Sequence, residues 1–197
     1  YFAATDGVHG DELFSYDGTH PPTMVADINP GAADSYPSAI VAAADKLYFS
    51  ATSPDGQMQL WSYDGTNPPV RVREGENSTS IPYAFPQIVF NNHLFFVGSS
   101  KLWYLDNNGV AHSIPIDSAN IYDHPSGSLA VFKNALYFSM TFQREVGGVA
   151  QANILYKYDG TNPATPISTP ETSPINVQQL FATTNTLYFT AQDQAGT

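Results

Sequence analysis

Short stretches of alternating apolar and polar residues run along the whole chain. In the clearest part of it they are "SAIVAAA" from Ser38, "KLYFSAT" from Lys46, "QLWSYD" from Gln59 and "PVRVRE" from Pro69. Aromatic and β-branched residues are frequent in these stretches, while Asp, Asn, Gly and Pro stand between them. No stretch has the spacing of an amphipathic helix. The pattern predicts an all-β protein made of short antiparallel strands.

One of these stretches returns at a nearly fixed distance along the chain. "LYFSAT" from Leu47 is matched by "YFAAT" at Tyr1, "LFFVGS" at Leu94, "LYFSMT" at Leu136 and "LYFTAQ" at Leu187. The equivalent positions 1, 48, 95, 137 and 188 are separated by 47, 47, 42 and 51 residues. Four strands repeated at this length are typical of propeller blades. We therefore predict a β-propeller of four-stranded antiparallel blades, as a single domain over residues 1–197. The units are about 1–46, 47–93, 94–135 and 136–187, and 188–197 repeats the start of a unit.

A second recurring stretch contains Tyr-Asp-Gly-Thr, as in "LWSYDGTNPP" from Leu60. The Asp side chain can accept a hydrogen bond from the backbone N–H two residues on, and Gly adopts a positive φ without steric cost. The motif therefore predicts a tight turn after a strand. Four aromatic residues precede this turn at equivalent positions, and we expect them to pack between neighbouring blades: Phe14, Trp61, Trp103 and Tyr156.

The stretches "DELFSYDGT", "MQLWSYDGT" and "NILYKYDGT" resemble the ELWxxDGT repeat family, and the resemblance covers essentially the whole chain. "KLWYLDNNG" departs from the pattern, because Asn-Asn-Gly replaces Gly-Thr. The resemblance implies propeller-like modules of large exported or surface proteins, mostly bacterial, without an assigned enzymatic role. It thus implies an extracellular or cell-surface location.

The charge balance excludes several kinds of partner. The chain has 18 acidic and 7 basic residues and a net charge of -11, so phosphate backbones and anionic membrane surfaces would repel it. Cations and neutral ligands such as sugars fit this charge better. There is no cysteine, which excludes disulfides and thiolate metal sites. The longest apolar runs are too short to span a bilayer.

The two ends of the chain carry the same strand. "YFTAQDQAGT" from Tyr188 aligns without gaps with "YFAATDGVHG" from Tyr1, so a closed ring of four blades has one strand in excess. The chain is then an excerpt of a longer propeller, or the extra strand packs beside its own ring, or it is donated to another subunit and builds a filament. The residues of this self-association strand are Leu187, Tyr188, Phe189, Thr190 and Ala191.

No pattern of catalytic residues emerges, and we predict no enzyme and no obligatory cofactor. The five histidines lie in different units without ligand spacing, and no nucleophile elbow is present. Asp6, Asp11 and Glu12 offer oxygens for Ca²⁺, although their spacing differs from an EF-hand and a solvated loop is the alternative.

Two further kinds of site are candidates. The aromatic faces of Trp61, Trp103, Phe14 and Tyr156 can stack on sugars, as an alternative to packing between blades. Asn77, in "NST", satisfies the N-glycosylation pattern. We predict a non-enzymatic extracellular module that associates with itself or with other surface proteins and forms filaments through its extra strand. The alternatives are a carbohydrate-binding propeller and an excerpt of a larger multi-blade surface protein.

Overall fold

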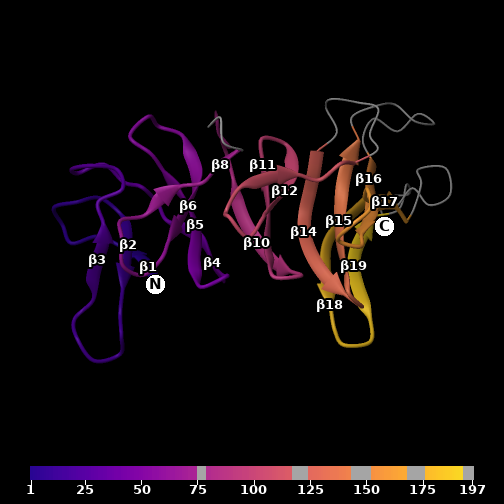
Figure 1. The fold of residues 1–197 in the computed structure, drawn as a ribbon, viewed down its shortest axis with the longest axis horizontal. Coiled ribbons are helices and arrows are strands. Elements are labelled where there is room, and N and C mark those ends of the chain that lie inside the picture. Colours follow the sequence, from indigo (N-terminus) through magenta and orange to yellow (C-terminus); the bar gives the residue numbers. More distant parts are fainter. Residues whose placement is uncertain (75–78, 117–123, 143–151, 168–175, 193–197) are drawn as a thin grey trace. The chain divides into compact units, whose positions relative to one another are not determined.

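A computed structural model describes residues 1–74, 79–116, 124–142, 152–167 and 176–192 (Figure 1). Within these ranges every regular element is a β-strand, so the predicted all-β class is confirmed. A search of the same ranges for a helix long and apolar enough to cross a membrane found none.

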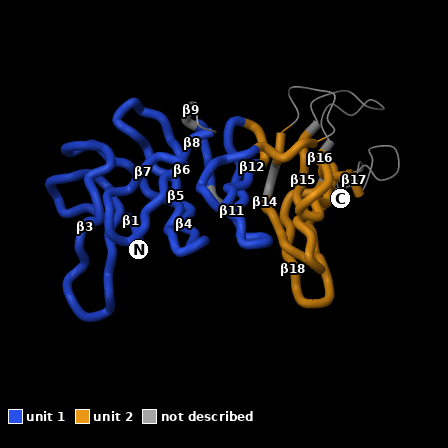
Figure 2. Tube along the Cα trace, viewed as in Figure 1, with its two compact units in different colours: residues 1–99, 103–112 blue, residues 100–102, 113–197 orange. Residues whose placement is uncertain are grey.

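The chain folds as two compact units. Unit 1 contains residues 1–99 and 103–112, and unit 2 contains residues 100–102 and 113–197 (Figure 2). The sheets of the described residues are open ones. The number of blades, the closure of a ring and the single domain therefore stay predictions.

The first two sheets of unit 1 are antiparallel and follow the chain order. The first has three strands, β1 (Phe2–Ala4), β2 (Glu12–Ser15) and β3 (Thr23–Ala26). The second has four, β4 (Ser38–Ala43), β5 (Lys46–Thr52), β6 (Met58–Tyr63) and β7 (Val70–Arg71). The second sheet matches the first three strands that the alternating pattern predicts for this repeat, and it contains only part of the fourth.

The third sheet has an order that the repeat does not predict. Its six strands lie in the order β10 (Phe85–Phe90), β11 (His93–Gly98), β12 (Lys101–Leu105), β13 (Ala111–Ser113), β8 (Arg73–Glu74) and β9 (Thr79–Ser80). β8 pairs with β13 in parallel, with Ala111 opposite Glu74. The stretch "PVRVRE", which we expected to be one strand, is thus divided between two sheets.

Unit 2 contains two antiparallel sheets. One has four strands, β14 (His124–Phe132), β15 (Ala135–Phe142), β16 (Ala152–Tyr158) and β17 (Thr165–Pro166). The other has two, β18 (Asn176–Ala182) and β19 (Leu187–Gln192). The second strand of the repeat, β19, is thus followed by no third strand in the described residues.

Side chains between neighbouring sheets form the core. In unit 1, Leu13 and Ile28 of the first repeat cluster with Phe49 and Trp61 of the second. In unit 2, Ala130 and Leu155 cluster with Val177 and Leu180 of β18. In both clusters, side chains of one repeat pack against those of the next, and this packing decides which of these side chains reach solvent.

The predicted turn chemistry is present at all four copies. The carboxylate oxygens accept from the backbone N–H two residues on at 2.8 to 2.9 Å, at Asp17, Asp64, Asp106 and Asp159. The glycines of these turns have φ values of 77 to 94°, a conformation that favours glycine. At Asp64 the Asn67 side chain donates a further bond, and these bonds lower the pKa of Asp64 to about 2.

Replacing Asp64 by Asn should make stability less dependent on pH in the acidic range. Because the pKa of Asp64 is lower in the folded chain than its ordinary value of 3.8, its charged form adds stability above about pH 4 that is lost as the pH falls toward 2. We expect the melting temperatures of Asp64→Asn and the parent to converge between pH 4 and pH 2. Thermal unfolding followed by circular dichroism at several pH values checks this, and a constant difference would contradict it.

Candidate functional site

The four aromatic residues before the turns lie in the interior. Their exposed fractions are 8% for Phe14, 9% for Trp61, 2% for Trp103 and 3% for Tyr156. The indole N–H groups are also bonded internally, from Trp61 to the Ala51 carbonyl at 3.2 Å and from Trp103 to the Gly98 carbonyl at 2.8 Å. These rings are therefore packed in the interior and present little surface on which a sugar could stack.

The three candidate calcium ligands do not converge. Asp6 accepts from the backbone N–H groups of Val8 and His9 and pairs with His9 Nδ1 at 2.8 Å. These bonds, the His9 backbone N–H first, hold the pKa of Asp6 well below its usual value. Asp11 bonds through its backbone, and Glu12 points into the interior. Among the described residues, no three His, Cys, Asp or Glu side chains are placed to hold a metal.

Glu12 has a structural environment that the sequence did not indicate. Its side chain is fully buried, and its carboxylate accepts from the Ile28 N–H at 2.9 Å, the Ser35 hydroxyl at 2.7 Å and the Asn29 N–H at 3.3 Å. All three donors belong to the loop that follows β3. The carboxylate therefore anchors this loop to the first sheet. Asn77, the candidate glycosylation site, lies outside the described residues.

The strand pair β18–β19 exposes large aromatic side chains. Phe181 is 67% exposed, Tyr188 55% and Phe189 44%. The residue that corresponds to Tyr188 in the second repeat, Tyr48, is 5% exposed. The Tyr-Phe pair of the same Leu-Tyr-Phe sequence is thus buried in one repeat and exposed to solvent in another, while the leucine is partly buried in both.

The register places four exposed side chains on one face of this pair. Phe181 is directly opposite Tyr188, and Gln179 is directly opposite Thr190. Opposed residues in an antiparallel pair share a face, and so do residues two apart on one strand. Leu180 lies on the other face, in the cluster shared with Ala130 and Leu155. We call Gln179, Phe181, Tyr188 and Thr190 the outer patch.

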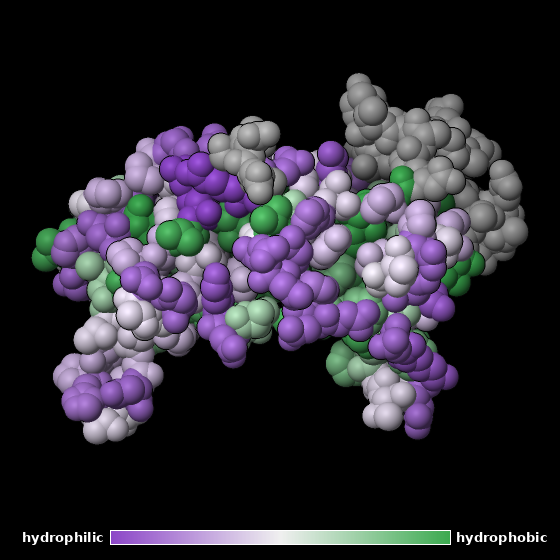
Figure 3. All heavy atoms as spheres, in the orientation of Figure 1, coloured by the Kyte–Doolittle hydropathy of each residue, from purple (hydrophilic) through white to green (hydrophobic). Residues whose placement is uncertain are grey.

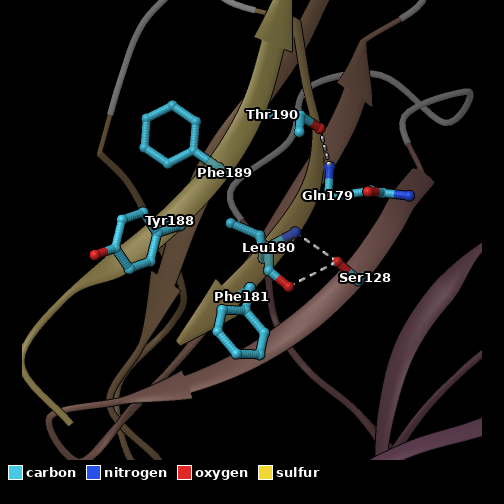
Figure 4. Close-up of a pocket in the computed structure, with 7 residues that line it drawn as sticks. All are labelled: Ser128, Gln179, Leu180, Phe181, Tyr188, Phe189 and Thr190. Carbon is cyan, nitrogen blue, oxygen red and sulfur yellow. Dashed lines mark hydrogen bonds between the residues drawn. The ribbon is translucent and has the colours of Figure 1, made fainter. Parts of the chain in front are cut away.

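A hollow of about 420 Å³ lies at the outer patch (Figure 4). Its lining is formed by Ser128, Gln179, Leu180, Phe181, Tyr188, Phe189 and Thr190. The Ser128 hydroxyl accepts from the Leu180 N–H at 2.7 Å and donates to the Leu180 carbonyl at 3.3 Å, which fixes β18 against β14. Thr190 Oγ1 accepts from the Gln179 N–H at 3.2 Å. The lining thus includes three aromatic residues, the hydroxyl groups of Ser128 and Thr190, and one primary amide.

The outer patch carries no ionisable group except the Tyr188 hydroxyl. β18 and β19 contain no Asp, Glu, Lys, Arg or His, although the chain as a whole has a net charge of -11. By contrast, the face of the molecule in Figure 3 is largely polar, with small separate apolar patches. The chemistry of the outer patch therefore suits a neutral ligand that combines apolar surface with hydrogen-bonding groups.

Comparisons with known proteins assign no family. No family model matches the chain, so the resemblance to ELWxxDGT repeats is neither supported nor refuted. No curated protein matches it. Among solved structures, the chain is similar to an alpha-L-arabinofuranosidase (CtGH43) from Clostridium thermocellum ATCC 27405. The identity is 14%, the match covers 98% of this chain and 76% of that chain, and the TM-score is 0.41.

This comparison corrects one of our predictions. We predicted a non-enzymatic structural or interaction module that builds filaments, but the solved structure found is that of an enzyme. The finding contradicts that prediction, and we do not maintain it. At this identity and TM-score the similarity assigns no activity to the chain, and the absence of enzymatic function stays a prediction.

Proposed function

We propose that the chain binds a neutral carbohydrate at the outer patch. The observation that carries this proposal is the exposed pair of Phe181 and Tyr188, directly opposite each other, beside Gln179 and Thr190 at a hollow of about 420 Å³. This volume falls within the range of about 300 to 1,000 Å³ that is usual for small-molecule sites. It has room for a short oligosaccharide.

Each part of the outer patch has a role in this proposal. The C–H faces of a sugar ring pack against the aromatic rings, which removes apolar surface from water. The Gln179 amide both donates and accepts hydrogen bonds, as sugar hydroxyls require. The Thr190 hydroxyl already accepts from the Gln179 N–H, so its own hydrogen is available to a sugar oxygen.

Charge selects among carbohydrates. Sulfated and uronic-acid sugars carry negative charge and are disfavoured by a chain with a net charge of -11. The outer patch itself has no basic side chain to offset this repulsion. The proposed ligands are therefore neutral glycans. We also propose an exported location and a propeller with four blades in this chain, on the resemblance and spacing of the repeats.

Replacing Tyr188 by Ala should reduce carbohydrate affinity about thirtyfold, as truncation of a central aromatic contact commonly does. The parent is first tested on an array of neutral oligosaccharides, and the best ligand is then titrated by calorimetry. Tyr16→Ala is the matched control, because Tyr16 has the same 55% exposure but lies in unit 1. An array without neutral ligands, or equal affinities of Tyr188→Ala and the parent, would overturn the proposal.

A further inference from the structure

A second hollow, of about 240 Å³, lies within unit 1. Its lining contains three of the seven Lys and Arg residues of the chain, Lys46, Arg71 and Arg73, and no acidic residue. Two acids that adjoin these cations in sequence, Asp45 and Glu74, do not line it. We call this hollow the basic hollow. It gathers positive charge in a chain whose net charge is -11, so it favours an anion locally.

Two of the three cations have charges that no acid offsets. The Arg71 Nη1 donates to Asp55 Oδ2 at 3.2 Å and to the side-chain oxygen of Gln59 at 3.3 Å. Lys46 and Arg73 are exposed, and within the described residues their side chains make no ion pair or hydrogen bond. The charge available to a ligand is therefore that of Lys46 and Arg73.

Two hydroxyl groups at the basic hollow also lack partners. Tyr48 is 5% exposed and Ser62 is 8% exposed, and the two residues are directly opposite each other on β5 and β6. Neither hydroxyl has a hydrogen-bond partner in the described part of the chain, and neither oxygen is sealed from solvent. Burial raises the pKa of Tyr48, so its hydroxyl keeps its proton and can donate. Because buried polar groups are normally bonded, these two donors point to an acceptor from outside the chain.

Two departures from the repeat help to build the basic hollow. "PVRVRE" is divided between β7 and β8, and β8 pairs in parallel with β13, which brings Arg73 to the lining. The turn before β13 is the copy in which Asn-Asn-Gly replaces Gly-Thr, and its Asn108 lines the hollow. The Asp106 carboxylate accepts from the Asn108 and Val110 N–H groups and pairs with His112. The irregular sheet and the altered turn thus supply one cation and one amide.

We propose that the basic hollow binds a small organic anion through its carboxylate or phosphate group. Lys46 and Arg73 supply the charge. The hydroxyls of Tyr48 and Ser62 and the amide of Asn108 donate hydrogen bonds to the anionic oxygens. The volume is below the range of about 300 to 1,000 Å³ that is usual for small-molecule sites, so the ligand is compact. The net negative charge of the chain does not exclude it, because exposed charges farther away than about 8 Å are largely screened at physiological salt.

The test titrates the whole chain with inorganic phosphate and, separately, with succinate, followed by the NMR shifts of the backbone amides. The buffer contains neither anion, and sodium chloride keeps the ionic strength constant. We expect saturable shifts at residues 71–73 and 108–110 with at least one probe, and the tighter probe identifies the preferred anionic group. Saturation with neither probe, or the largest shifts at other residues, would overturn the proposal.

Substitutions of single cations separate the basic hollow from the charge of the chain as a whole. Lys46→Gln and Arg73→Gln should each bind the tighter probe about tenfold more weakly, because each removes a charge-assisted hydrogen bond. Lys157→Gln removes an equal charge from an exposed position in unit 2 and should bind within twofold of the parent. Equal weakening in Lys157→Gln would contradict the proposal, since net charge alone would then attract the anion.

Tyr48→Phe tests the site at constant charge. It should bind the tighter probe about fivefold more weakly, since one hydrogen bond is lost. Its melting temperature without the anion should be no lower than that of the parent, because the lost hydroxyl has no partner in the protein. An affinity equal to that of the parent would count against the hydroxyl as a ligand-binding group and would overturn the proposal.

This site does not rest on the proposed carbohydrate site, because the two hollows share no residue. Tyr188→Ala should therefore bind phosphate and succinate within twofold of the parent. A larger loss in Tyr188→Ala would contradict the placement of the anion in the basic hollow.

Discussion

Truncation of Phe49 to alanine is expected to lower the free energy of unfolding by about 3 to 5 kcal/mol. Phe49 is fully buried, lies opposite Trp61 and belongs to the cluster that joins the first and second sheets of unit 1. The alanine variant loses the transfer free energy of the ring and leaves a cavity that a β-sheet core fills poorly. The melting temperature should fall by roughly 10 °C, at about 2 to 4 °C for each kcal/mol.

Phe189→Ala is the matched control for this prediction. The position is equivalent in the repeat and the chemistry of the change is identical, but the ring is 44% exposed. We expect a loss of about 1 kcal/mol, because a half-exposed ring contributes little burial and its removal leaves no closed cavity. Urea unfolding followed by circular dichroism measures both midpoints and slopes. Equal losses in the free energy of unfolding for Phe49→Ala and Phe189→Ala would contradict the difference in burial between the two rings. They would also contradict the solvent exposure of the β18–β19 pair.

Local features of the fold follow directly from the sequence. The alternating pattern predicts strands over 38–44, 46–52 and 59–64, and the structure has strands at Ser38–Ala43, Lys46–Thr52 and Met58–Tyr63. The turns at the Asp-Gly copies follow in the same way, since one side chain and one glycine determine their geometry. Both features depend on interactions within a few residues, which a single sequence contains.

Features that depend on distant partners are not predictable in this way. Nothing in "PVRVRE" indicates that Glu74 will pair with Ala111, because that pairing depends on how a loop is placed by the rest of the sheet. The outer patch is a second example. "LYF" at residues 47–49 and at residues 187–189 is the same local sequence. Tyr48 and Phe49 are covered by side chains of β6 and of the neighbouring sheets, whereas Tyr188 and Phe189 are exposed.

Glu12 is the third example, and its removal is the second large effect that we expect. The neighbouring acids Asp6 and Asp11 suggested a calcium ligand in a loop, but the Glu12 side chain is buried and bonded to the segment that follows β3. Glu12→Ala should cost about 2 to 4 kcal/mol. The Ile28 N–H and the Asn29 N–H would lose their acceptor, and an unpaired buried donor costs about 1 to 3 kcal/mol. The Ser35 hydroxyl would keep only the Asp11 carbonyl, at 3.1 Å.

Two other variants separate this anchoring role from a simple effect of charge. Asp11→Ala removes an equal charge from the adjacent position. The hydrogen bonds of Asp11 to Asp34 and Ser35 involve its backbone, so they remain in this variant. Asp11→Ala should therefore change the free energy of unfolding by less than about 0.5 kcal/mol. Glu12→Gln keeps the shape and one acceptor oxygen, and should lie between Glu12→Ala and the parent.

The local readout is hydrogen exchange at Ile28 and Asn29. Their amides should exchange faster in Glu12→Ala than in Asp11→Ala, because only the first variant frees the loop while the sheets remain paired. Urea midpoints for the three variants give the global effect, and repeating them with calcium or a chelator tests a metal at the same residue. If Glu12→Ala were as stable as Asp11→Ala, with unchanged exchange at Ile28, the carboxylate would not be what holds this loop. The loop would then depend on the Asp34 side chain, which accepts from the Asp11 N–H at 2.7 Å.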